Sequence, residues 1–116
     1  MNKELKVLVE KLCEDLTSAL NQRFEHTIGV TTHSYSVGQK YIRIFSEEDG
    51  SPRSAWGFIN KKEFQKGATG ITFKEGDVLK CAGWNTPALN APRGNLFEGY
   101  EIYPNSMRMF GPDYLR

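Results

Sequence analysis

The sequence has few of the residues that carry common enzyme chemistry. It contains two histidines, His26 and His33, and two cysteines, Cys13 and Cys81, far apart along the chain. Neither pair has the spacing of a metal-ligand motif or of a nucleophile with its base. The glycine-containing segment 67–70 lacks the lysine and the following helix that a phosphate-binding P-loop requires. We therefore predict that the protein is not an enzyme and uses no metal or cofactor.

The chain also lacks a surplus of charge of either sign. Its 15 lysines and arginines nearly balance its 14 acidic residues, for a net charge of +1. This balance argues against a non-specific binder of nucleic acid or of membrane surfaces, which usually carries a clustered basic excess. The N-terminal segment MNKELKVLVEKL is charged throughout, so we expect neither a signal peptide nor a membrane span. Together with the free cysteines, this predicts a cytoplasmic protein.

The length of 116 residues is typical of one domain. No internal repeat and no linker divides the chain. We predict a single domain over residues 1–116, with a helix in 1–26, an antiparallel sheet in 30–103 and a docking tail in 104–116. The tail carries several large apolar side chains, so we expect it to pack on its own domain or on a neighbouring subunit.

The first 24 residues have the strongest periodicity in the chain. Leucines and one phenylalanine recur at spacings of three and four, which predicts an amphipathic helix. These residues are Leu5, Leu8, Leu12, Leu16, Leu20 and Phe24. Asn2 precedes the pattern and is a suitable N-cap. At the other end, His26 is expected to complement the helix dipole.

After Gly29 the period changes to two, which is typical of strands. Strands are predicted at 30–37, 41–45, 53–59, 78–84 and 99–103. Residues 60–75 are interpreted as an excursion between two strands, in which 61–66 is a candidate helical turn and 71–73 a candidate short strand. His33 is expected to lie exposed in the first strand. Asp49-Gly50 is a strong hairpin signal, and Ile42 and Ile44 alternate toward the core. The predicted fold class is α+β: an N-terminal helix on an antiparallel sheet of about five strands.

The segment 76–95, GDVLKCAGWNTPALNAPRGN, is the strongest candidate for a functional site. An apolar strand leads to Trp84, and Pro87 and Pro92 then force an irregular loop. An aromatic ring beside amide and guanidinium groups on a loop is suited to ligand binding. The candidate residues are Trp84, Asn85, Arg93 and Asn95, with Arg53 and Arg108 as further anion binders. The alternative is that Trp84 is a core residue and the loop a surface connection.

Several motifs resemble a widespread set of small bacteriophage proteins. They are KYIRI, a DG turn, SPRS with an FI strand, GDVLK-x-A-x-W-x-x-P-A, RGN and a C-terminal YLR, over residues 40–116. Within this set the chain resembles the anti-Thoeris sponge family, whose members sequester a cyclised ADP-ribose signal of a bacterial defence system without cleaving it. The resemblance implies a helix on an antiparallel sheet, a homo-oligomer such as a dimer or hexamer, and a possible second site for cyclic oligonucleotides.

Transferred to this sequence, the resemblance implies that Trp84 stacks on adenine with Asn85 beside it. Asn95 would contact polar groups of the ligand, and Arg53 and Arg108 would meet its pyrophosphate. We therefore expect a non-enzymatic binder of a cyclic ADP-ribose isomer in the host cytoplasm, with no membrane and no specific nucleic-acid partner. Two alternatives are an inhibitor that binds a host protein through the apolar tail, and a weak binder of single-stranded nucleic acid. A nucleic-acid binder should lose affinity steeply as the salt concentration rises. The net charge of +1 makes this alternative the least favoured.

Overall fold

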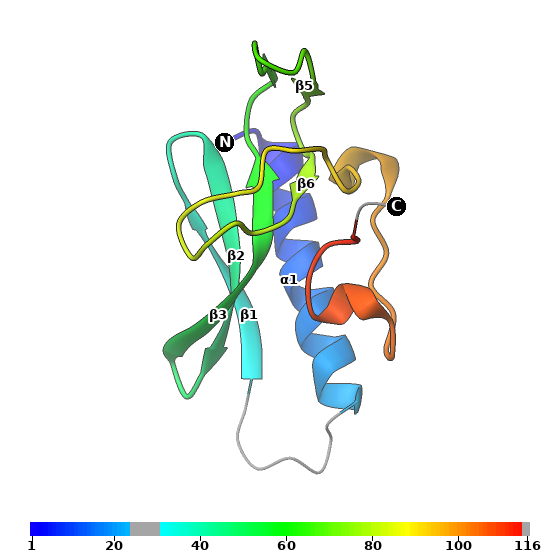
Figure 1. The fold of residues 1–116 in the computed structure, drawn as a ribbon. Coiled ribbons are helices and arrows are strands. Elements are labelled where there is room, and N and C mark those ends of the chain that lie inside the picture. Colours follow the sequence, from blue (N-terminus) through cyan, green and yellow to red (C-terminus); the bar gives the residue numbers. More distant parts are fainter. Residues whose placement is uncertain (24–30, 115–116) are drawn as a thin grey trace.

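One helix packs along a four-stranded antiparallel sheet, as Figure 1 shows. This computed structural model describes residues 1–23 and 31–114. The elements are α1 (Lys3–Arg23), β1 (Thr31–Val37), β2 (Tyr41–Glu48), β3 (Ser51–Asn60), β4 (Phe64–Gln65), β5 (Thr72–Phe73), β6 (Val78–Leu79), η1 (Leu96–Glu98) and η2 (Met107–Met109). The sheet order is β1-β2-β3-β6, and β4 and β5 form a separate two-stranded sheet. The predicted α+β class is confirmed.

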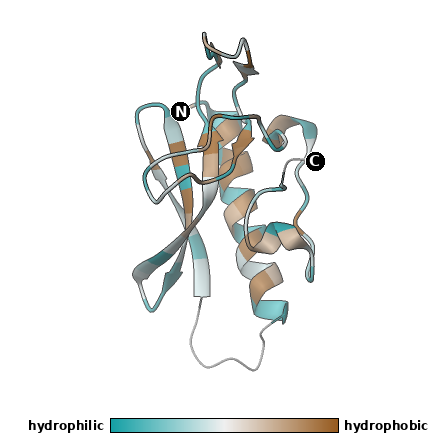
Figure 2. Cartoon of the chain, viewed as in Figure 1, coloured by the Kyte–Doolittle hydropathy of each residue, from teal (hydrophilic) through white to brown (hydrophobic). Residues whose placement is uncertain are grey.

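Helix α1 begins and packs as its sequence indicates. The Asn2 side-chain oxygen accepts a hydrogen bond from the Glu4 backbone N–H at 2.8 Å, which satisfies one of the free donors of the first turn. The residues buried against the sheet are Leu5, Val9, Leu12, Cys13, Leu16 and Ala19, and Leu8 and Leu20 flank them. Figure 2 shows this apolar side of the helix turned toward the apolar central strands. Phe24 and His26 lie outside the described residues.

The β2–β3 hairpin closes through Asp49 and Gly50, whose φ angles are 52° and 81°. Positive φ at both central residues is the geometry of a two-residue hairpin turn, so the sequence signal is confirmed. The register shifts twice along the hairpin, and these bulges leave Arg53 and Trp56 without a partner in β2. Strict alternation along β3 would place Trp56 and Phe58 on the same face of the sheet. The bulge at Trp56 changes this, and the two side chains join different hydrophobic clusters.

The sheet is covered on both faces. Ile42, Ile44 and Ile59 pack against α1 in the larger cluster, as predicted for the two β2 residues. On the opposite face, Phe58 and Leu79 pack with side chains of the β4–β5 hairpin and of the segment 81–89 in a second cluster. In Figure 1 the β4–β5 hairpin projects beyond one end of the four-stranded sheet. The segment after β6 crosses in front of that sheet. Tyr41, Arg43 and Phe45 alternate with the isoleucines and therefore belong to this second face.

Three sequence predictions of secondary structure are wrong. Strand β6 ends at Leu79 instead of residue 84, because residues 80–88 fold back on themselves: the Ala88 N–H donates to Lys80 O at 2.7 Å. Residues 99–103 form no strand, since residues 93–96 already occupy the adjacent backbone edge, with hydrogen bonds from Arg93 N to Val78 O and from Val78 N to Gly94 O. The predicted helical turn at 61–66 is replaced by β4 and the chain that precedes it.

The tail packs on its own domain. Met109 and Pro112 are almost fully buried, and Pro112 lies directly against Gly57 of β3. The Trp56 indole N–H donates to the Arg108 carbonyl at 2.7 Å, which fixes the tail to the sheet. Within residues 1–23 and 31–114, no helix is long and apolar enough to cross a membrane.

Candidate ligand-binding site

Trp84 lies over the side chain of Arg43 on the second face of the sheet. The Arg43 guanidinium carbon is 4.5 Å from the centre of the Trp84 ring and 5.6 Å from that of Phe45. The indole keeps 39% of its surface exposed, so it is not a core residue. Stacking between an arginine and an indole is favourable by about 0.5–1 kcal/mol at exposed sites. Trp84 therefore forms a fixed, partly exposed wall.

Asn85 holds the same arginine from the side. Its Oδ1 accepts a hydrogen bond from Arg43 Nη1 at 2.6 Å. Arg43 Nε, by contrast, is buried and has no hydrogen-bond partner among the described residues. A buried donor without a partner costs about 1–3 kcal/mol, and more when the group is charged.

Two hollows lie on either side of Tyr41. The larger, which we call the Arg43 hollow, has a volume of about 310 Å³, and the second, the Asn60 hollow, has about 250 Å³. The Arg43 hollow is lined by Ser36, Val37, Gly38, Phe58 and Asn85 in addition to Arg43. The Asn60 hollow is lined by Asn60, Lys62, Glu63 and Phe64. Gln39, Lys40 and Tyr41 line both, so the two hollows are adjacent.

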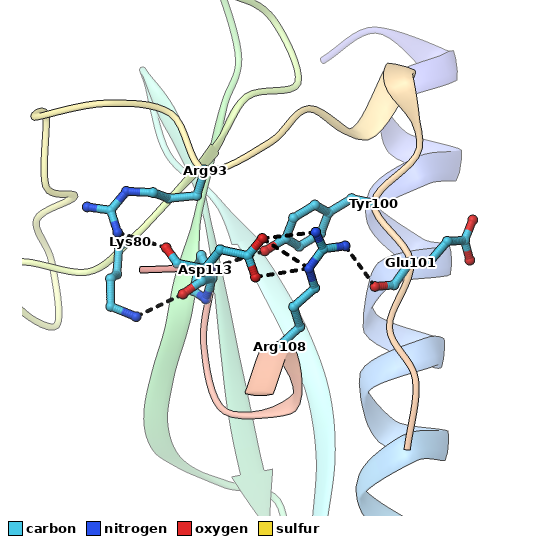
Figure 3. Close-up of polar contacts among 7 residues, drawn as sticks. Lys80, Arg93, Tyr100, Glu101, Arg108 and Asp113 are labelled. Carbon is cyan, nitrogen blue, oxygen red and sulfur yellow. Dashed lines mark hydrogen bonds and ion pairs between the residues drawn. The ribbon is translucent and has the colours of Figure 1, made fainter. Parts of the chain in front are cut away.

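Arg93 and Arg108 hold the tail in place. In Figure 3, Asp113 lies between these two arginines. The Arg108 guanidinium grips the Asp113 carboxylate through Nε at 3.0 Å and Nη2 at 2.9 Å, and its Nη1 donates to Glu101 O. Arg93 Nη1 donates to the Asp113 carbonyl at 2.8 Å. The hydrogen bond to Asp113 raises the pKa of Arg108.

All the donor nitrogens of these two arginines are in use. The remaining Arg93 nitrogens donate to Ala91 O and Asn90 Oδ1. Lys80 completes the group, because its ammonium donates to Pro112 O at 2.8 Å (Figure 3). The network thus binds backbone and carboxylate oxygens of the chain itself, which is a structural role.

Asn95 and Arg53 lie apart from Trp84. Asn95 is 8% exposed; its amide donates to Glu75 O and Asp77 Oδ1, and its oxygen caps η1 through the Phe97 N–H. Arg53 sits in a bulge beside the β2–β3 turn and forms an exposed ion pair with Glu48 at 3.0 Å. The bulge lies opposite the step from Ser46 to Glu47, so at about 3.3 Å per residue Arg53 is roughly 12 Å along the strand from Arg43. Of the six predicted residues, only Trp84 and Asn85 lie at Arg43, whereas Arg93 and Arg108 meet at Asp113.

Arg43 and Asn60 are the site residues that the sequence interpretation missed. Arginines within strands were set aside as structural, although Arg43 stands between Tyr41 and Phe45 on one strand face. A cation between two same-face aromatic rings is a signal that could have identified it, because neighbours on one face of a strand contact one another. Asn60 gave no sequence signal, since its burial depends on the β4–β5 hairpin.

The titratable groups of the described residues offer little for acid–base catalysis. Burial raises the pKa of the Cys13 thiol to about 12, and burial also raises the pKa of Tyr41. Burial lowers the pKa of His33 to about 4, and its Nδ1 is shielded, so the prediction of an exposed histidine is wrong. Within the described ranges, no group of three or more His, Cys, Asp or Glu could hold a metal ion.

A family model covering residues 1–102 matches the chain, and the protein belongs to that family, a family of unknown function (DUF7717). The match includes α1, the whole sheet and both hollows, whereas the tail from residue 103 lies beyond it. No curated protein and no solved structure matches the chain.

Proposed function

We propose that this protein binds a small nucleotide-type anion in the Arg43 hollow and holds it without chemical change. The observation that carries the proposal is the state of Arg43. Its side chain is fixed by Trp84 and Asn85, and its Nε has no partner among the described residues. A guanidinium held in one orientation is preorganised for phosphate oxygens, which it matches in geometry as well as in charge.

The surroundings of Arg43 favour a ligand that combines an anion with flat rings. Ser36 pairs with Arg43 across β1 and β2 and lines the same hollow, which adds a hydroxyl group. Lys40 lies on the rim as a second cation. Tyr41 and Phe58 provide aromatic walls, and their rings contact each other edge to face at 6.4 Å. A volume of about 310 Å³ is at the lower end of the range for ligand pockets, roughly 300–1,000 Å³.

The narrower proposal is that the ligand is a cyclic ADP-ribose isomer and that binding sequesters an immune signal. Its support is the resemblance of the GDVLK-x-A-x-W-x-x-P-A and RGN motifs to the anti-Thoeris sponges. A sponge must bind without turnover, and this agrees with a site formed by aromatic, amide and guanidinium groups. On this proposal the protein is a phage product that acts in the host cytoplasm.

Titration calorimetry tests both levels of the proposal. We expect heat of binding with a cyclic ADP-ribose isomer and with AMP, and an affinity at least tenfold lower in Arg43→Lys, because an ammonium cannot stack flat or bind phosphate in bidentate fashion. Arg53→Lys is the matched control, since Arg53 is exposed and remote, and it should bind like wild type. Binding of AMP alone would refute the narrower proposal, and silence with both ligands would refute the broader one.

The tail surface supports a second candidate, a protein-binding function. Met107, Phe110 and Tyr114 are 71%, 56% and 71% exposed and line one shallow hollow. The Asp113 network holds this segment in place, so these apolar groups are presented on an ordered surface. A pull-down from host lysate should retain a stoichiometric protein on wild type and not on Phe110→Asp. Recovery of a small molecule without a protein would favour the ligand-binding proposal.

A further inference from the structure

Asn60, which lines the Asn60 hollow, has a side-chain oxygen for which the described residues provide no partner. Asn60 is fully buried at the end of β3. Its amide nitrogen donates to Lys62 O and to Lys74 O, both at 3.0 Å, which fixes the orientation of the amide group. Its Oδ1 is shielded and accepts no hydrogen bond from residues 1–23 or 31–114. Buried acceptors are nearly always paired, so this one calls for a donor from outside the described chain.

The walls of the Asn60 hollow are suited to a flat ring. Tyr41 and Phe64 stand edge to face with their centres 6.4 Å apart. Phe64 is itself stacked on Phe73 at 5.1 Å, with an angle of 18° between the rings, so its position is set by the β4–β5 hairpin. Lys62 and Glu63 form an exposed outer rim in a segment without regular structure.

We propose that the Asn60 hollow is the base subsite of the ligand whose phosphate binds at Arg43, and that it selects a base with an exocyclic amino group. The inference rests on the proposed function. Its geometric basis is that Gln39, Lys40 and Tyr41 line both hollows, so one molecule can place its anionic group on Arg43 and its ring beside Phe64. The amino group then donates to Asn60 Oδ1, while Lys40 lies between the two subsites.

This assignment differs from a base stacked on Trp84. One face of that indole is already covered by the Arg43 guanidinium. On this proposal Trp84 acts as a positioning residue for Arg43, and the ring of the ligand lies in the Asn60 hollow. Loss of Phe64 should weaken binding through the base, whereas loss of Arg43 should weaken binding through the phosphate.

Three small probes separate the contributions: AMP, purine riboside 5′-monophosphate, which lacks only the amino group, and ribose 5-phosphate, which lacks the base. For the wild-type chain we expect calorimetry to give about fivefold weaker binding for the second probe, the effect of one hydrogen bond, and at least tenfold weaker binding for the third. Phe64→Leu should lower the affinity for AMP about tenfold and leave that for ribose 5-phosphate unchanged. Phe97→Leu, at a 41% exposed position on η1, is the matched control.

The outcomes also distinguish this inference from the function on which it rests. If none of the three probes binds, the proposed function is wrong. If all three bind with one affinity, phosphate binding stands and the base subsite is refuted. Equal affinities for AMP and purine riboside 5′-monophosphate, with ribose 5-phosphate weaker, would remove the role of Asn60, because its acceptor would then be satisfied by water. The probe comparison needs no variant, so a folding defect cannot obscure it.

Discussion

Two asparagines on either side of Pro87 and Pro92 have different environments. Asn95 is buried and makes three hydrogen bonds, whereas Asn85 is exposed and contacts only the Arg43 side chain. Asn95→Ala should lower the free energy of unfolding by about 2–4 kcal/mol, because several buried groups lose their partners. Asn85→Ala should change it by less than about 0.5 kcal/mol, the usual range for surface substitutions, and should instead weaken ligand binding. Urea unfolding of both variants gives the comparison, and equal losses would contradict the separation of roles.

His33 should make the stability of the fold depend on pH. Its pKa is about 4 in the folded chain, because burial disfavours the charged ring, against an ordinary value of 6.5. The unfolded chain therefore binds more protons between these values, so stability is complete above about pH 6.5 and decreases as the pH falls toward 4. The loss amounts to roughly 3 kcal/mol at 1.36 kcal/mol per pKa unit.

The measurement is urea unfolding of wild type and His33→Gln at several pH values from 7 to 4. The carboxylates and His26 are common to both chains, so their contributions cancel in the difference. We expect the stability of wild type to fall more steeply than that of the variant over this interval. Parallel curves would show that His33 titrates in the folded chain as it does in the unfolded one.

At the scale of elements, the tail should depend on Asp113. Its carboxylate binds Arg108 in bidentate fashion, and its carbonyl accepts from Arg93. Asp113→Ala should lower the free energy of unfolding by about 1–2 kcal/mol, the contribution of hydrogen bonds to charged groups at a partly exposed site. It should also speed tryptic cleavage after Arg108, because that side chain is released.

Asp15→Ala is the matched control for the tail. Asp15 pairs with Lys11 one turn away on the helix surface, with side-chain exposures of 33% and 55% for the acid and the lysine. Such a pair contributes about 0.3–0.5 kcal/mol. Cleavage after Arg108 at the same rate in both variants would show that the tail is held by its apolar residues alone.

The elements that could be predicted from the sequence are those with local signals. The leucine spacing and Asn2 defined α1, and Asp49-Gly50 defined the β2–β3 hairpin, since periodicity and turn residues act over a few positions. The early end of β6 and the unpaired segment 99–103 depend on which distant segment occupies a backbone edge. No local pattern carries that information.

The candidate site likewise combines residues that the sequence could group with one that only the fold brings to them. Trp84 and Asn85 are neighbours in the chain and remain together in the structure, so the sequence could group them. Arg43 reaches them from β2 through tertiary packing alone. The sequence also predicted Arg93 and Arg108 as anion binders. In the structure both donate to Asp113 of the same chain, Arg93 to its carbonyl and Arg108 to its carboxylate. Residue type indicated the chemistry, and only the fold determined the partner.

At the scale of the whole molecule, the sheet separates two regions with different roles. Helix α1 covers one face and forms the larger hydrophobic cluster, while the other face carries the smaller cluster and both hollows. A substitution such as Arg43→Lys therefore changes a face that does not contact the main core. We expect it to leave the melting temperature within a few degrees of wild type, because Arg43 is half-buried and lies outside the larger hydrophobic cluster.

The tail surface bears on the assembly of the molecule. The sequence prediction of a homo-oligomer requires an apolar contact, and Met107, Phe110 and Tyr114 supply exposed apolar area on a fixed segment. We expect light scattering after gel filtration to give a multiple of the mass of 13.2 kDa for wild type and the single-chain mass for Phe110→Asp. A single-chain mass for both proteins would contradict the homo-oligomer, and the tail surface would then need a different protein as its partner.

The two indoles of the chain differ in their access to water. Trp56 is 4% exposed and hydrogen-bonded to the tail, whereas Trp84 is 39% exposed on the second face of the sheet. A dissolved quencher such as iodide should therefore extinguish the emission of Trp84 and leave that of Trp56. The quenchable fraction of the fluorescence then becomes an intrinsic, label-free optical signal for the loop, recorded in the same cuvette as a separate signal for the folded interior.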